Sequence, residues 1–122
     1  MKKVKKYDIW LVDLNPVKGS EQSGIRPCVI LQNDLFFEYQ KTTLIAPITS
    51  QFKQGKCIIG LNDYHSYGLE LPSSLLVFQL RTIDKNRCIK KIGSIDDEKT
   101  RKQINTSLLL TLDTNDDFLH KV

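Results

Sequence analysis

The sequence is poor in the side chains with which proteins most often bind metals or form covalent cross-links. It has two histidines, His65 and His120, and three widely spaced cysteines without a C-x-x-C pair: Cys28, Cys57 and Cys88. A structural zinc site needs four such ligands, and a disulfide framework needs an even number of cysteines. We therefore expect no metal site, no cofactor and no disulfide, and cysteines that pack as small buried hydrophobic side chains.

Long hydrophobic runs are also missing. No window approaches the 18 or more apolar residues of a membrane span, and no apolar segment follows the basic N-terminus, Met1–Lys6. We expect a cytoplasmic protein with no membrane contact and no signal peptide. The length of 122 residues suits one domain, which we expect at residues 1–112, followed by a flexible tail at 113–122.

Positive charge is in excess and is unevenly distributed. The net charge is +4, but residues 1–112 hold 17 Lys and Arg against 11 Asp and Glu, and the last ten residues hold Lys121 against three aspartates. The body of the protein is therefore more basic than the average indicates. Such a balance permits a polyanionic partner such as nucleic acid, or an acidic protein segment, and is also common on ordinary solvated surfaces.

The hydrophobic pattern predicts short strands followed by one helix. The expected strands are 7–14, 26–32, 42–48, 57–61, 74–80 and 88–92, with a short turn at 35–39 capped by Asp34. The helix is expected at 94–112, capped by Ser94 with Asp97, and Ile104, Leu108, Leu109 and Leu112 form its apolar stripe. This order predicts a mainly β fold, a small half-open antiparallel barrel with a C-terminal helix packed on it.

A polar loop bounded by glycines precedes the most apolar strand. Gly19 and Gly24 allow this loop to fold back tightly, and Pro27 favours an extended backbone at Arg26. Arg26 is therefore predicted to be a fixed cation where the loop meets a strand, a position at which binding and catalytic residues concentrate.

Several short motifs occur in an order that resembles the MazF/PemK/Kid family of toxin endoribonucleases. They cover residues 7 to about 112 and are Asp8-Ile9-Trp10, Asp13-Leu14-Asn15-Pro16, Gly19-Ser20-Glu21-Gln22-Ser23-Gly24, Arg26-Pro27, Gln32-Asn33-Asp34, Ile48-Thr49-Ser50, Tyr67-Gly68-Leu69 and Leu80-Arg81-Thr82-Ile83-Asp84-Lys85. The resemblance implies an SH3-like, MazF/CcdB-like barrel, a homodimer, and a cognate antitoxin that covers the RNA groove. It also implies metal-independent, sequence-preferring cleavage of single-stranded RNA, which inhibits translation and growth.

The same resemblance assigns the catalytic roles to Arg26 and Thr49. RNA carries its own nucleophile, the 2′-OH, so an enzyme need only align that group and stabilise the developing charge. The products would be a 2′,3′-cyclic phosphate and a 5′-OH end. A guanidinium suits the phosphoryl oxygens and could serve as a general acid, but it is too basic to act as a plain general base.

The group that accepts the 2′ proton is left open by the sequence. Glu21 is one candidate base, although a solvated loop carboxylate is the more ordinary interpretation. Substrate contacts are expected at five positions: Glu21, Gln22, Ser23, Ser50 and Gln79. Arg81 and Asp84 are expected to form a structural ion pair. The alternative function is a non-catalytic, CcdB-like topoisomerase poison on the same fold.

Overall fold

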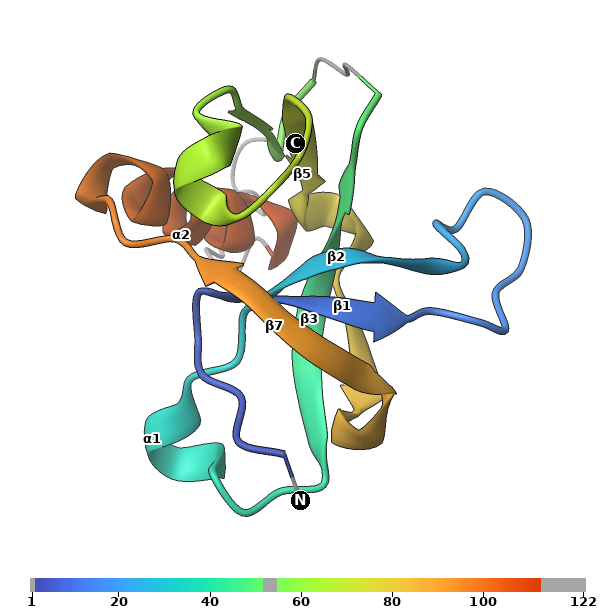
Figure 1. Cartoon of the computed structure of the whole chain (residues 1–122). Helices are drawn as coiled ribbons and strands as arrows, with labels where there is room; N and C mark the ends of the chain where they lie inside the picture. The colour runs from blue at the N-terminus through green and yellow to red at the C-terminus, as the bar shows by residue number, and fades with distance from the viewer. Residues whose placement is uncertain (1, 52–54, 113–122) are drawn as a thin grey trace, which may run out of the picture.

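Short strands dominate the fold and a single long helix follows them (Figure 1). The structure is a computed structural model and describes residues 2–51 and 55–112, so the expected tail at 113–122 lies outside it. The strands are β1 (Asp8–Asp13), β2 (Ile25–Ile30), β3 (Thr42–Thr49), β4 (Ile58–Leu61), β5 (Ser73–Leu76), β6 (Arg81–Asp84) and β7 (Cys88–Ser94). The helices are α1 (Asp34–Phe37) and α2 (Glu98–Leu112), and the single 3-10 turns are η1 (Tyr64–Tyr67), η2 (Val77–Gln79) and η3 (Lys85–Arg87). None of the described helices is long and apolar enough to span a membrane.

Strand β3 holds the sheet together because it pairs with three other strands. Thr42–Ile45 pair with β6, Ile45–Pro47 pair with β2, and Ile48 and Thr49 pair with β5. The strand order is β4-β5-β3-β2-β1-β7 with β6 beside β3, and the pairings are antiparallel. The two end strands, β4 and β7, do not pair with each other, so the sheet stays open. This confirms the predicted half-open antiparallel fold with a C-terminal helix.

The central strands are buried on both faces and supply two hydrophobic clusters. Val29 of β2 belongs to the cluster that α2 covers with Ile104. Its neighbours Cys28 and Ile30 belong to the second cluster, on the other face, together with Ile45 of β3. Alternate residues of a strand point to opposite faces of a sheet. The continuous apolar run in β2 therefore reflects burial on both sides, as the sequence predicts.

Two of the three cysteines are buried as expected. Cys28 and Cys88 are fully buried and unpaired, whereas Cys57 is only half-buried and its Sγ lies 3.4 Å from the carbonyl oxygen of Ser107. Burial raises the pKa of the Cys28 thiol far above its usual range and raises that of Cys88 to about 11. Both thiols therefore stay protonated and pack as apolar side chains near neutral pH.

The predicted strand at 74–80 is wrong in its second half. The chain is extended only over β5 and then turns through η2 before β6 begins at Arg81. The N–H of Val77 donates to the carbonyl oxygen of Cys57 at 2.9 Å, and the N–H of Leu80 donates back to Val77 at 3.1 Å. These bonds close a turn and redirect the chain, so that β6 pairs with the first half of β3.

The predicted cap of α1 is wrong, and the predicted cap of α2 is right only for Asp97. Helix α1 is capped by Asn33 and not by Asp34, because the Asn33 Oδ1 accepts from the N–H of Leu35 at 2.8 Å. Helix α2 begins at Glu98, and the carboxylate of Asp97 accepts from the N–H of Thr100 at 2.9 Å. Ser94 ends β7 instead, and its hydroxyl donates to Asp96.

The apolar stripe of α2 is only partly as predicted. Ile104 is fully buried and Leu108 packs beside it, but Leu109 and Leu112 are exposed. At 3.6 residues per turn, Leu109 lies about 140° around the helix from Ile104. The buried face runs instead through Thr100, Ile104 and Ser107, where α2 covers β4 and η2.

Candidate functional site

Arg26 is held at the start of β2 by the loop that precedes it. This loop joins β1 to β2 and projects away from the sheet (Figure 1). Gly19 and Gly24 have positive φ angles of 60° and 79°, which allow the predicted tight return. The N–H of Leu14 donates to the carbonyl oxygen of Gly24 at 3.0 Å, and the Nε of Arg26 donates to that of Ser23 at 2.9 Å.

The guanidinium of Arg26 keeps its outer edge open. Its Nε is occupied by Ser23, but within residues 2–51 and 55–112 no hydrogen bond or ion pair involves its two terminal nitrogens. The side chain is half-buried. A guanidinium in this state presents two parallel N–H donors, the arrangement that binds two oxygens of one phosphate.

Thr49 ends strand β3, and its side chain is buried. Its relative exposure is 4%, its backbone pairs with Ser74 of β5, and its Oγ1 accepts from the N–H of Gln51 at 3.2 Å. The β2–β3 ladder pairs Cys28 with Pro47, and two further steps of this register would set Arg26 opposite Thr49. The two strands separate before that point, because β3 turns to β5.

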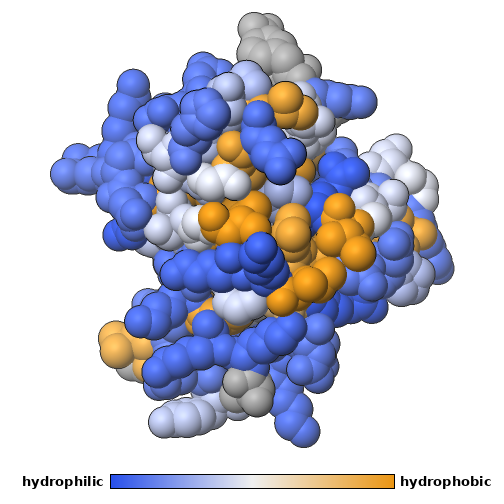
Figure 2. Space-filling model, viewed as in Figure 1, coloured by the Kyte–Doolittle hydropathy of each residue, from blue (hydrophilic) through white to orange (hydrophobic). Residues whose placement is uncertain are grey.

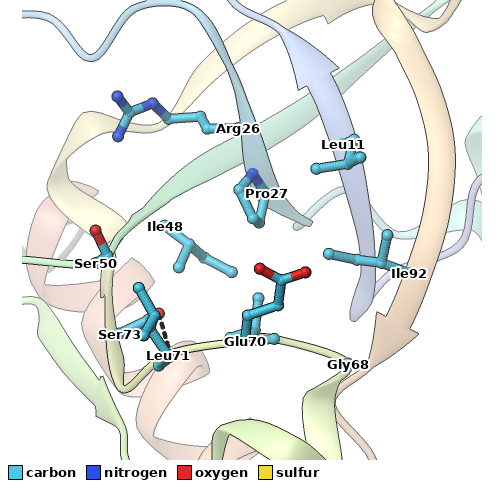
Figure 3. Close-up of a pocket in the computed structure, with 11 residues that line it drawn as sticks. Leu11, Arg26, Pro27, Ile48, Ser50, Gly68, Glu70, Leu71, Ser73 and Ile92 are labelled. Carbon is cyan, nitrogen blue, oxygen red and sulfur yellow. Dashed lines mark hydrogen bonds between the residues drawn. The ribbon is translucent and has the colours of Figure 1, made fainter.

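A pocket of about 440 Å³ lies beside Arg26 (Figure 3). Ser50 is exposed and lines this pocket, whereas Thr49 does not. The rest of the lining is largely apolar and comes from Leu11, Pro27, Ile48, Leu69, Leu71 and Ile92, with Gly68, Glu70 and Ser73. On the same face of the molecule, Figure 2 shows apolar side chains gathered over β1, β2 and β7 with hydrophilic side chains around them.

Three of the other four expected substrate contacts line a second, smaller pocket of about 240 Å³. Glu21, Gln22 and Gln79 line it, and the N–H of Gln22 donates to the Gln79 Oε1 at 3.2 Å. The Oε1 of Glu21 accepts from the N–H of Lys18 at 3.3 Å. Ser23 lines neither pocket. The structure therefore groups Arg26 with Ser50, groups Glu21 with Gln22 and Gln79, and leaves Thr49 buried.

The expected ion pair between Arg81 and Asp84 does not form. The Nη1 of Arg81 donates to the carbonyl oxygen of Leu14 at 3.2 Å, and the Asp84 carboxylate accepts from the N–H of Asn86 at 2.8 Å. Arg87 likewise donates to the carbonyl oxygen of Asp13 at 3.1 Å. Both arginines thus fasten the base of the β1–β2 loop to the sheet, by bonds to main-chain oxygens.

Glu70 is a site residue that the sequence reasoning missed. It follows the Tyr67-Gly68-Leu69 motif directly and reaches into the Arg26 pocket (Figure 3). Gly68 has a φ of 76°, and a Cβ atom there would lie 2.0 Å from the carbonyl oxygen of Ile92. Because η1 and β7 approach so closely here, the backbone of Glu70, two residues later, lies beside the pocket. The glycine in the motif indicates a close approach of the backbone, but the sequence does not show which segment it approaches.

The residues described by the structure hold no group of three or more His, Cys, Asp or Glu side chains close enough to bind a metal ion.

Comparison with known proteins decides the family. Residues 5–112 match the family described as the PemK-like, MazF-like toxin of type II toxin–antitoxin systems. The chain belongs to this family.

Two curated relatives agree with this assignment over nearly their whole length. The MazF-like chain is 40% identical over 110 residues to the endoribonuclease EndoA of Bacillus subtilis, covering 89% of this chain and 94% of the relative. It is 38% identical over 110 residues to the endoribonuclease MazF of Staphylococcus saprophyticus, covering 89% and 91% respectively.

A solved structure of MazE–MazF from Deinococcus radiodurans has the same fold. It superposes with a TM-score of 0.73 at 17% identity and covers 94% of this chain and 100% of that one. The MazF-like fold inferred from the motifs is therefore confirmed.

Proposed function

We propose that this MazF-like toxin is an endoribonuclease that cleaves single-stranded RNA at preferred sequences, without a metal, and so inhibits translation and growth. Its membership of the toxin family and its sequence identity of 40% to an endoribonuclease over most of the chain support the reaction class. The observation that carries the proposal is the open edge of the Arg26 guanidinium beside a pocket of about 440 Å³. The cytoplasm, where RNA is translated, is the compartment in which this activity would act.

The reaction is a transesterification within the RNA strand. The 2′ oxygen forms a bond to the neighbouring phosphorus, the bond from phosphorus to the 5′ oxygen breaks, and the products end in a 2′,3′-cyclic phosphate and a 5′-OH. One proton leaves the 2′-OH and one is gained by the 5′ oxygen, so charge builds on the non-bridging oxygens in between. Preorganised donors aimed at those oxygens lower the barrier.

Arg26 is assigned to these oxygens. Its terminal nitrogens can donate two parallel hydrogen bonds to the phosphoryl group, and its permanent charge balances the charge that develops there. It can also lie close enough to protonate the leaving 5′ oxygen. It cannot accept the 2′ proton, because the guanidinium of the free enzyme is already protonated and has no acceptor atom. Glu21 is a candidate for that step only if the RNA backbone spans both pockets, since Glu21 lines the smaller one.

Thr49 and Ser50 are assigned as hydroxyl donors at the end of β3. Because the Thr49 Oγ1 already accepts from Gln51, its own O–H is left to donate, but the side chain is buried beneath the surface. Ser50 is exposed and lines the Arg26 pocket. Ser50 is therefore the more accessible of the two hydroxyls.

The remaining substrate contacts are assigned to the neighbouring nucleotides of the RNA. Gln22 and Gln79 are bonded to each other and Glu21 lies beside them in the smaller pocket, next to the β1–β2 loop. Ser23 supports this site through its backbone, since its carbonyl oxygen holds the Nε of Arg26. An RNA strand that follows this loop would pass from one pocket to the other.

We further propose a cognate antitoxin and a homodimer as the partners of this chain. The related Deinococcus protein is a MazE–MazF structure, and type II toxins are paired with a protein antitoxin. The net charge of +4 suits an acidic antitoxin segment, because opposite charges accelerate association.

The test is cleavage of a long RNA by purified protein in the presence of EDTA, with the cut ends mapped and their phosphate state determined. Arg26→Ala should lower the rate by at least about 10²–10³, since removing one such donor has that effect. Thr49→Ala and Ser50→Ala should each cause a smaller loss, and their order shows which hydroxyl reaches the phosphate. Lys99→Ala, an exposed change on α2, is the matched control.

Two results would reject the proposal. One is full ribonuclease activity in a folded Arg26→Ala variant, because the charge on the phosphate would then be balanced by another group. The other is RNA that stays intact while the wild-type protein still arrests growth. That second result would favour the CcdB-like topoisomerase poison, which shares the fold and cuts no RNA.

A further inference from the structure

Glu70 is the carboxylate that the described part of the chain places in the Arg26 pocket. Its side chain is exposed and points into the pocket between Ile48 and Ile92 (Figure 3). Within the described residues, Glu70 takes part in no side-chain hydrogen bond and no ion pair. Both carboxylate oxygens are therefore available to accept hydrogen bonds from a bound molecule.

The pocket has three chemically different parts in sequence. Arg26 stands on one side and Glu70 on another, Pro27 and Ile48 form an apolar surface between them, and Ile92 lies beyond Glu70 (Figure 3). Its volume of about 440 Å³ falls within the range of small-molecule sites. A ligand that fits must carry an anion, then a flat apolar face, then an edge with N–H donors. A nucleotide has these parts in this order: phosphate, base face and base edge.

We propose that Glu70 reads the Watson–Crick edge of the base beside the phosphate held by Arg26, and so sets the base preference of cleavage at that position. This proposal rests on the ribonuclease function above and extends it to the choice of base. Proteins read unpaired RNA bases by stacking on their faces and by hydrogen bonds to their edges.

A carboxylate accepts hydrogen bonds and cannot donate them, so it favours bases according to the donors on their edges. Guanine presents two adjacent donors, N1–H and the N2 amino group, and can give both to one carboxylate. Adenine and cytosine each present one amino group beside a ring nitrogen that accepts. Uracil presents one N–H between two carbonyl oxygens, which a carboxylate repels. The expected order of preference is guanine first, then adenine and cytosine, and uracil last.

The backbone that carries Glu70 is well anchored, as a reading residue requires. Leu69 is buried, and its N–H donates to the carbonyl oxygen of Tyr64 at 3.0 Å. The hydroxyl of Tyr67 donates to Asp97 at 2.7 Å and lies 3.1 Å from the Oγ1 of Thr100, which ties η1 to the start of α2. The backbone that leads into Glu70 is therefore held in place before any ligand binds.

The first experiment compares cleavage by the wild type and by Glu70→Gln on four RNA oligonucleotides that differ only at one base beside the cut site. The wild type should cut the guanine substrate about 10- to 100-fold faster than the uracil substrate, the range expected for one bidentate base contact. Glu70→Gln replaces one acceptor oxygen by an NH₂ donor, so the preference should fall to within a few-fold. The control, Glu98→Gln, also removes one negative charge, on the exposed face of α2, and should leave the base preference unchanged.

The second experiment does not depend on cleavage. Guanosine and uridine 5′-monophosphates are titrated separately into wild type and Glu70→Gln, and backbone amide shifts are followed by NMR. In the wild type, guanosine monophosphate should shift the amides of Arg26 and of residues 68–73 at lower concentration than uridine monophosphate. In Glu70→Gln the two nucleotides should bind alike.

The outcomes separate this inference from the function on which it rests. If the wild type cuts RNA but Glu70→Gln keeps the same base preference, the base-reading role is wrong and the ribonuclease function stands. An equal loss on all four oligonucleotides also refutes it, since that result indicates a role in the chemical step. If the wild type cuts no RNA but binds guanosine monophosphate through Glu70, the base pocket is supported and the ribonuclease function fails.

Discussion

Replacing Gly68 by alanine should destabilise the protein far more than the same replacement at Gly19. Both glycines have positive φ angles, 76° and 60°, so each substitution forces alanine into the left-handed region at about 1–2 kcal/mol. The added methyl group at Gly19 meets nothing within 4 Å, whereas at Gly68 it would lie 2.0 Å from the carbonyl oxygen of Ile92.

The extra cost at Gly68 follows from this clash with backbone. Separating η1 from β7 enough to relieve it disturbs Tyr67 and Leu69, each only 7% exposed. Overpacking of this kind typically costs about 1–3 kcal/mol. The total for Gly68→Ala is then about 2–5 kcal/mol, against about 1–2 kcal/mol for Gly19→Ala. The loss of backbone entropy in the unfolded chain is the same for both variants and cancels in their difference.

The measurement is urea unfolding of both variants and the wild type at one protein concentration, because a self-associating protein changes its apparent stability with concentration. The free energies of unfolding are compared at equal m-values. If the two variants lose the same stability within error, the close contact between Gly68 and Ile92 does not exist in solution. The placement of Glu70 would then lose its structural basis.

Two further substitutions test the packing and the start of α2. Ile104→Ala should lower the free energy of unfolding in urea by about 2–5 kcal/mol, because the Ile104 side chain is fully buried. Leu109 is 65% exposed, so Leu109→Ala should lower it by less than about 0.5 kcal/mol. Similar losses for the two variants would contradict the observed buried face. Asp97→Ala should cost about 0.5–2 kcal/mol at pH 7 through loss of the helix cap. Hydrogen bonding from the Thr100 side chain lowers the pKa of Asp97 to about 2, so this stabilisation is present above the unfolded pKa near 4 and is lost as the pH falls toward 2. The variant and the wild type should therefore converge over that interval, and a difference that stays constant with pH would rule out the cap.

The order of apolar and polar residues was enough to predict those strands whose residues are apolar because they are buried. The continuous apolar run of β2 indicates a strand covered on both faces, and Cys28 and Val29 do belong to opposite clusters. The pattern fails at Val77, where an equally apolar run turns, because the turn depends on a hydrogen bond to the distant Cys57. It also fails at Ser94, because pairing with Asp8 extends β7 to that residue and delays the helix.

The sequence could predict a residue of the candidate site only where its neighbours in the sequence determine its position. Arg26 could be predicted from its neighbours, since Gly24 and Pro27 shape its backbone directly. Glu70 could not, because its place beside Arg26 depends on the contact between Gly68 and β7, which joins two distant parts of the chain. The resemblance to a family also could not reveal that Thr49 is buried while Ser50 faces the pocket.

The way in which the β1–β2 loop is fastened has a consequence for how this protein can change over evolution. Arg81 and Arg87 bind main-chain carbonyl oxygens at the base of the loop, on Leu14 and Asp13, and every amino acid provides such an oxygen. Residues farther along the loop can therefore be exchanged without loosening its root, much as antibody loops vary on a constant framework. The loop is therefore suited to loop grafting. The tip of a loop taken from a relative should occupy the same position beside Arg26.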